Sequence, residues 1–218
     1  MLGRMHAQPI HRVSDESSAA LIAFALPSPL GRLCGVASPS GVCLLTFAPP
    51  AEALMCFSAD RRAELIGSLH ELVEGVESSS DQQLGEPLSA WLGDLRRYLH
   101  GKSRSLAIPV DFRLARTPFH HAVYEELLRV KPGQTTTYGD VARLVGRPLA
   151  SRAVGQAVGK NPIALIIPCH RVLGRDGSLH GFAFGLAKKA ALLKLEGVDP
   201  ALPGTSRSWD REVRADSR

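Results

Sequence analysis

The chain has 218 residues, enough for one large domain or two small ones. Its composition, 44% hydrophobic and 22% charged, excludes collagen-like, coiled-coil and wholly disordered proteins. The net charge of +5 is unevenly spread, because residues 113–194 carry 13 basic and 4 acidic side chains whereas residues 1–112 carry 9 and 12. Such a concentration favours a polyanionic partner, most often nucleic acid, although a solvated basic face explains it as well.

The chain lacks the features of a secreted or membrane protein. No apolar stretch approaches the roughly 20 residues that span a bilayer, and residues 1–20 have charged side chains but no continuous apolar segment. We therefore expect an intracellular protein without a membrane partner, in the cytoplasm of a prokaryote or the nucleus of a eukaryote. The cysteines form no Cys-x-x-Cys pair and no zinc quartet, so we expect free thiols and neither metal nor cofactor; they are Cys34, Cys43, Cys56 and Cys169.

The first half of the chain predicts a small α/β domain. Short apolar runs are separated by Pro-, Ser- and Gly-rich turns typical of hairpins, and amphipathic stretches follow them. The predicted elements are strands over 21–26, 33–37 and 42–47 and helices over 59–76 and 88–99. We expect a flexible segment over 1–20 and then a structural domain over 21–112, a small antiparallel sheet plus helices, in which little looks chemical.

The second half predicts a mostly helical domain over 113–198, followed by a flexible tail over 199–218. Pro118 suits the first position of a helix, and Thr137 can cap the next one with Asp140 in the position of a capping box. Two short helices joined by Gly146-Arg147-Pro148 form a candidate helix-turn-helix. The predicted helices cover 118–130, 138–145, 149–159 and 186–195.

The second helix of this pair is poorly equipped to read DNA sequence. Base readout in the major groove needs long polar side chains, but only Arg152 and Gln156 project far from a helix made mostly of alanine, glycine and valine. Such a helix suits shallow docking on a duplex, with Arg152 as a probe into the base stack. Tight helix–helix packing by small residues is the simpler interpretation of the helix alone.

Cys169 is the candidate nucleophile. A cysteine is commonly a small buried hydrophobe, but here Pro168 fixes the backbone before the thiol, and His170 and Arg171 supply a proton acceptor and a cation that favour the thiolate. Glu196, near the end of the last helix, lies where the helix dipole disfavours an anion, which indicates a partner such as His170. Neighbouring residues point in different directions, so we expect His170 to reach the sulfur through a water molecule rather than directly.

These residues resemble the O6-alkylguanine-DNA alkyltransferases (methylated-DNA–protein-cysteine methyltransferases). The similarity is strong over residues 118–198 and weaker in the N-terminal half, through Ser28-Pro29-Leu30-Gly31. It rests on Asn161-Pro162 and Ile167-Pro168-Cys169-His170-Arg171-Val172, supported in the same order by Thr137-Tyr138-Gly139-Asp140, Ser151-Arg152-Ala153-Val154-Gly155 and Leu192-Leu193-Lys194-Leu195-Glu196-Gly197.

The resemblance implies a monomeric repair protein that binds double-stranded DNA containing O6-alkylguanine and flips the damaged base into a pocket; activity on O4-alkylthymine stays open. Cys169 would accept the alkyl group irreversibly, His170 would act as a water-mediated base, and Glu196 would orient it. Tyr138 would contact the flipped guanine and assist proton delivery, and Asn161 would brace the active-site turn.

The resemblance also implies the DNA contacts and the pocket. Arg152 would fill the vacated place in the base stack. The other implied DNA contacts are Thr137, Ser151 and Gln156, and the implied pocket residues are Val172, Phe182, Ala183 and Phe184. Phe184 stands where the family usually has glycine, so we expect a narrower pocket that reacts poorly with O6-benzylguanine.

Two other classes remain open from the sequence. A non-catalytic protein that binds or flags damaged DNA would accept no alkyl group, and a thiol hydrolase would turn over. An alkyltransferase would accept one group per molecule.

Overall fold

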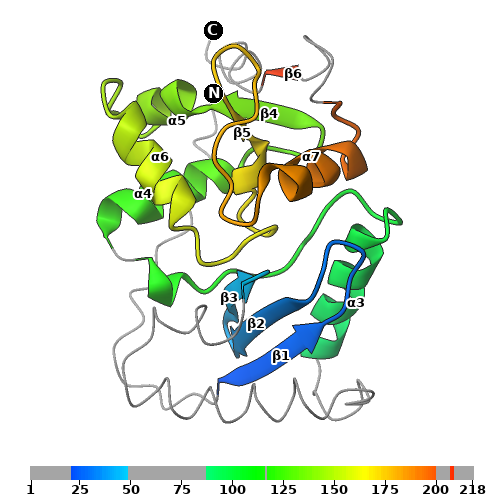
Figure 1. Ribbon diagram of the computed structural model, residues 1–218. Helices are drawn as coiled ribbons and strands as arrows, with labels where there is room; N and C mark the ends of the chain where they lie inside the picture. The colour runs from blue at the N-terminus through cyan, green and yellow to red at the C-terminus, as the bar shows by residue number, and fades with distance from the viewer. Residues whose placement is uncertain (1–20, 49–86, 116, 200–206, 209–218) are drawn as a thin grey trace, which may run out of the picture.

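The computed structural model describes residues 21–48, 87–115, 117–199 and 207–208 (Figure 1). The first part forms an antiparallel sheet in the order β1-β2-β3, as the hairpin pattern predicted. Its strands are β1 (Ile22–Leu26), β2 (Leu33–Ser38) and β3 (Gly41–Thr46). The helix expected over 59–76 lies outside the described residues, as do residues 1–20.

Helix α3 (Leu88–Leu99) has the predicted bounds. It buries one face, including Trp91, Leu95 and Tyr98, in the same apolar core as the strands. Figure 1 shows it running alongside the sheet. The prediction of a small antiparallel sheet with helices is confirmed for this part of the chain.

The second part is mostly helical, with helices α4 (Pro118–Leu128), α5 (Tyr138–Leu144), α6 (Ser151–Gly159) and α7 (Leu186–Leu195) and the short 3₁₀ helices η3 (Phe112–Leu114) and η4 (Cys169–Arg171). Thr117 caps α4, which has a proline at its start. Thr137 caps α5, because its hydroxyl accepts a hydrogen bond from the Asp140 amide at 3.2 Å. Figure 1 places α5 and α6 side by side as a helix-turn-helix.

Several details differ from the sequence prediction. Helix α4 ends at Leu128 rather than Val130, and α5 ends at Leu144 rather than Val145. Helix α6 begins at Ser151 rather than Leu149, and Leu149 is 98% exposed in the turn before it. A small parallel sheet in the order β5-β4-β6 was missed. Its strands are only two to four residues long and have no alternating apolar pattern: β4 (Gln134–Thr137), β5 (Val172–Leu173) and, within the expected tail, β6 (Arg207–Ser208).

The N-terminal sheet is tied to the second part by backbone hydrogen bonds. The Leu45 amide of β3 donates to the Pro162 carbonyl at 2.9 Å, and the Ala164 amide donates to the Leu45 carbonyl at 2.8 Å. A single apolar core continues from the strands and α3 into α4, α5, α6 and α7. None of the described helices has the length and apolar character that crossing a membrane requires.

Candidate active site

Two tight turns present Cys169. Leu165 has φ +72°, and the Ile166 amide donates to the Ala164 carbonyl at 2.9 Å, which closes a γ-turn. Pro168, with φ −81° and ψ 62°, is the centre of an inverse γ-turn closed by the Cys169 amide and the Ile167 carbonyl at 2.8 Å. Proline is restricted to φ near this value, so Pro168 fixes the backbone before the thiol. The side chain of Cys169 is buried.

The side chain of Asn161 holds the segment between Ile163 and Ile167 in place. Its Nδ2 donates to the Ile167 carbonyl at 2.8 Å, and its Oδ1 accepts from the Ile163 amide at 3.0 Å. The two bonds tie Asn161, which lies two residues beyond the end of α6, to both sides of the turn before Cys169. The same side chain lowers the pKa of the Cys169 thiol.

His170 and Glu196 form a buried pair. Nε2 of His170 lies 3.1 Å from Oε1 of Glu196, and both side chains are fully buried. The carboxylate can only accept, so Nε2 carries the proton and Nδ1 has a free lone pair. Nδ1 has no hydrogen-bond partner in the described part of the chain. An imidazole held in this tautomer by a carboxylate is equipped to accept a proton at Nδ1.

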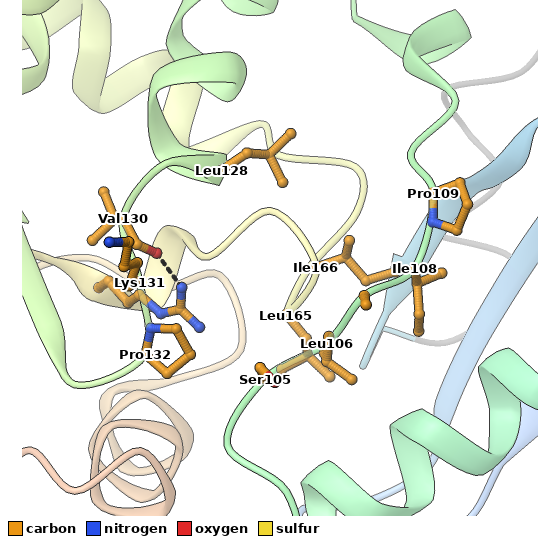
Figure 2. A pocket seen from close by; sticks show the side chains of 12 residues that line it. Ser105, Leu106, Ile108, Pro109, Leu128, Val130, Lys131, Pro132, Leu165 and Ile166 are labelled. Atoms are coloured by element: carbon orange, nitrogen blue, oxygen red, sulfur yellow. Dashed lines mark hydrogen bonds between the residues drawn. The ribbon is translucent and has the colours of Figure 1, made fainter.

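Arg171 completes the charge balance of this pair. Its Nε and Nη2 donate to the two carboxylate oxygens of Glu196 at 2.9 and 2.6 Å. Its Nη1 donates to the Val130 carbonyl at the end of α4, the dashed line in Figure 2, beside a cavity of about 330 Å³. From its place beside the thiol, Arg171 was expected to favour the thiolate of Cys169. Its guanidinium instead neutralises Glu196.

The electrostatics of the pair follow from these contacts. Burial raises the pKa of Glu196, but hydrogen bonds and charges from His170 and then Arg171 outweigh it and hold the pKa at about 2. Burial lowers the pKa of His170, and Glu196 opposes that shift. His170 is therefore neutral near neutral pH, as a general base requires.

Tyr98 was missed by the sequence analysis. Its side chain is buried, and its hydroxyl donates to Oε1 of Glu196 at 2.7 Å, across 98 positions of sequence. A tyrosine on the apolar face of an amphipathic helix is usually a core residue, so nothing in the neighbouring sequence distinguished Tyr98 from one.

Lys189 was also missed. This lysine of α7 is fully buried, and its Nζ donates to the carbonyls of Val172 at 2.6 Å and His180 at 2.5 Å. Burial lowers the pKa of Lys189 to about 8, and the negative charge of Cys169 opposes this shift only in part. A lysine in a Leu- and Ala-rich helix could have been noticed as a charge on a buried face.

Several groups around the Cys169 thiol favour its thiolate, but burial outweighs them and the pKa of Cys169 is raised. Burial raises the pKa of Cys169, and this is opposed first by the hydrogen bond from Asn161 and then by the positive charge of Lys189. The backbone amides of Cys169 and His170 act in the same direction. Lys189 is thus the cation whose charge lowers the pKa of Cys169.

Tyr138 and the loop before α7 lie beside this cluster. The hydroxyl of Tyr138 donates to the His180 carbonyl at 3.4 Å. Burial and the nearby Cys169 charge raise the pKa of Tyr138, so the phenol stays protonated. Ala183 is exposed in the same loop, and Val172 presents a carbonyl already bonded to Lys189.

The ring of Phe184 packs edge-on against two other rings. Its centroid lies 5.3 Å from that of Phe182 and 5.5 Å from that of Phe47. Phe47 follows β3, so the ring of Phe184 joins the loop before α7 to the N-terminal sheet.

The exposed face of α6 carries the residues singled out for DNA contact. Ser151, Arg152 and Gln156 are exposed, whereas Val154 and Ala157 are fully buried. Thr137 lies at the start of α5, where its hydroxyl already accepts from the Asp140 amide and donates to the Asp140 carboxylate at 2.7 Å. The small residues of α6 therefore serve packing on one side and leave Arg152 projecting on the other.

Comparison with known proteins adds a family. The DNA-binding domain of 6-O-methylguanine DNA methyltransferase matches residues 118–198. The inducible methylated-DNA–protein-cysteine methyltransferase of Bacillus subtilis is 40% identical over 111 residues, which are 51% of this chain and 61% of that protein. The methylated-DNA–protein-cysteine methyltransferase of Mycobacterium bovis is 38% identical over 134 residues, 61% of this chain and 80% of the relative.

Solved structures agree over more of the chain. The O6-methylguanine methyltransferase of Mycobacterium tuberculosis aligns with a TM-score of 0.58 and 29% identity over 81% of this chain and 93% of that one. The same organism's OGT in complex with DNA aligns with a TM-score of 0.59 and 29% identity, over 84% and 96%. The fold of both parts of the chain is therefore shared with these proteins.

Proposed function

Since this chain belongs to the methylated-DNA–protein-cysteine methyltransferase family, we propose that it repairs O6-alkylguanine in double-stranded DNA by moving the alkyl group to Cys169. The observation that carries the proposal is the relay around the thiol. Cys169 is buried next to an imidazole whose Nε2 is held by Glu196 and whose Nδ1 has an unused lone pair. A core cysteine with only a packing role would need no such neighbours.

In the proposed reaction the sulfur of Cys169 attacks the alkyl carbon, the carbon–O6 bond breaks and a thioether forms. The thiol proton passes to Nδ1 of His170 through a bridging water, and the resulting imidazolium is stabilised by Glu196. Tyr138, kept protonated by its surroundings, donates a hydrogen bond as negative charge develops on the departing guanine. The guanine recovers one proton, so the net change is transfer of the alkyl group and of the thiol proton.

The DNA side of the proposal rests on α6. A base must leave the stack to reach a buried thiol, at a cost of a few kcal/mol that a side chain inserted in its place offsets in part. Arg152 projects from the exposed face of α6 and is the candidate for this place, with Ser151 and Gln156 beside it. The excess of positive charge over residues 113–194 supplies affinity for the phosphates.

The pocket, in this proposal, is bounded by the Val172 carbonyl and the loop that carries Phe182, Ala183 and Phe184. Residues 113–198 would hold the nucleophile and bind DNA, and residues 21–112 would support them. All the residues in the relay come from one chain, so we expect a monomer to act, inside the cell where its DNA substrate lies.

Intact-protein mass spectrometry tests this function. The protein is incubated with increasing amounts of duplex DNA containing O6-methylguanine, with unmodified duplex as the control. We expect the protein mass to rise by one methyl group and no further, and the amount of repaired DNA to equal the amount of protein. An unchanged mass despite DNA binding, or release of several methyl groups per protein molecule, would contradict the proposal.

A further inference from the structure

The N-terminal part of the chain reaches the relay through Tyr98. This residue lies in the last turn of α3, and only 1% of its surface is exposed. Its hydroxyl is 2.7 Å from Oε1 of Glu196 and 3.4 Å from Nε2 of His170. It therefore stands at the junction of the carboxylate and the imidazole, on the side away from Nδ1.

Three donors converge on the same oxygen of Glu196. Oε1 receives the Tyr98 hydroxyl at 2.7 Å, Nη2 of Arg171 at 2.6 Å and Nε2 of His170 at 3.1 Å. The hydrogen bond from His170 is the longest of the three. The carboxylate divides its negative charge among these donors, so each of the others weakens its hold on the imidazole proton.

Tyr98 can donate this hydrogen bond to Glu196 at any physiological pH. Burial, and after it the negative charge of Glu196, raise the pKa of Tyr98 far above its usual value, so the phenol remains a donor. The backbone around it is also fixed, because α3 packs in the core shared by both parts of the chain. The geometry is thus that of a preset contact rather than a chance approach of a mobile side chain.

We propose that Tyr98 is a positioning residue for alkyl transfer, whose hydroxyl fixes the Glu196 carboxylate and thereby sets the orientation and proton affinity of His170. This inference rests on the proposed function, and it assigns to the N-terminal part of the chain a share in the chemistry. Tyr98 acts through its contacts with the Glu196 carboxylate and the adjacent His170 imidazole.

The direction of the effect follows from the groups around His170. Glu196 favours its protonated form, whereas the charges of Arg171 and Lys189 oppose it. Removing the Tyr98 hydroxyl leaves more of the Glu196 charge to attract the imidazole proton. His170 then becomes protonated at a higher pH, and the acid limb of the transfer rate moves the same way.

The test compares two buried tyrosines that each lose one hydroxyl. In Tyr98→Phe we expect the acid limb of the single-turnover transfer rate to shift upward by about half to one pH unit, which is roughly a three- to tenfold change in proton affinity. Tyr124→Phe is the matched control, because the Tyr124 hydroxyl is equally buried but donates to the Ala157 carbonyl at 3.0 Å rather than to Glu196. It should leave the pH profile in place.

A second measurement separates this inference from the proposed function. The titration of His170 is followed by NMR in protein with labelled histidine and without DNA, in the wild type, in Tyr98→Phe and with 3-fluorotyrosine at position 98. The more acidic fluorophenol keeps the packing and donates more strongly, so it should move the His170 titration to lower pH while Tyr98→Phe moves it to higher pH. This result holds even for a protein that transfers no alkyl group.

The outcomes are distinct. Opposite shifts from the two changes at position 98, with none in Tyr124→Phe, support the role of Tyr98. An unmoved His170 titration, together with a transfer rate lowered equally at every pH, would reduce Tyr98 to a packing residue and overturn the inference. Absence of alkyl transfer in the wild type would overturn the proposed function alone.

Discussion

Replacing Glu196 by glutamine should disable the relay and destabilise the protein together. The carboxylate of Glu196 accepts two hydrogen bonds from Arg171, one from Tyr98 and one from His170, all in the buried core. In Glu196→Gln the charge of Arg171 loses its counterion, and an amide nitrogen that can only donate faces other donors. Breaking a buried ion pair in this way costs about 3–5 kcal/mol of unfolding free energy.

The pKa of Glu196 gives a consistent magnitude. Its ordinary value of 4.5 falls to about 2 in the folded protein, and a shift of this size corresponds to about 3 kcal/mol. A lowered carboxyl pKa stabilises the fold fully above pH 4.5 and loses that contribution as the pH falls toward 2. The wild type should therefore lose stability over this acid range, whereas Glu196→Gln should show a much flatter dependence.

The assays are urea unfolding at neutral and acid pH and single-turnover transfer from DNA containing O6-methylguanine. We expect transfer in Glu196→Gln to slow by about 100-fold or more, because His170 loses the partner that fixes its tautomer. Glu125→Gln is the control, since Glu125 forms a partly exposed pair with His121 at 3.5 Å; it should change stability by less than about 1 kcal/mol. A Glu196→Gln protein with wild-type stability and transfer rate would refute the reasoning.

Three further predictions concern the surroundings of the thiol and the DNA contact. Lys189→Met removes the cation that lowers the pKa of Cys169, so transfer should slow by about tenfold at neutral pH. The difference from the wild type should shrink in alkaline buffer. A difference that stays constant across the rate–pH profile would argue against this role of Lys189. Arg152→Ala should slow repair of duplex DNA by about tenfold or more, yet spare reaction with the free base, since only the duplex requires flipping; equal losses on both substrates would contradict that role. Phe184→Gly should raise the rate ratio of O6-benzylguanine to O6-methylguanine by about tenfold. In the control Phe47→Ala we expect an unchanged ratio and lower thermal stability. The same result in Phe184→Gly would show that Phe184 makes only a packing contact.

The sequence predicted those helices whose ends and caps are marked by neighbouring residues. The bounds of α3 follow from an amphipathic stretch, the end of α7 follows from the Glu196-Gly197 that closes it, and the cap of α5 follows from Thr137 three residues before Asp140. The start of α6 was placed two residues early, because Leu149 looks like a helix former but lies almost fully exposed in the turn. Strand β4 has no apolar alternation, and it exists only because two other segments pair with it.

The residues of the site likewise differ in how far the sequence predicted them. The motif around Cys169 and the position of Glu196 at a helix end predicted the pairing of His170 with Glu196, which the structure confirms at 3.1 Å. Tyr98 reaches Glu196 across 98 residues, and Lys189 reaches the Val172 carbonyl from the buried side of α7. Tertiary contacts of this kind are not encoded in residue spacing. The sequence therefore contains no signal for Tyr98, and for Lys189 only a charge on an otherwise apolar face of α7.

The central claim is that Cys169, in the setting given by Asn161, His170 and Lys189, receives the alkyl group. The most direct measurement is tandem mass spectrometry of peptides from protein that has reacted with duplex DNA containing O6-methylguanine, in the wild type and in Cys169→Ala. The account predicts the methyl group on Cys169 alone, with Cys34, Cys43 and Cys56 unmodified and no methyl group anywhere in Cys169→Ala. A methyl group on another residue, or methyl transfer by Cys169→Ala, would contradict it.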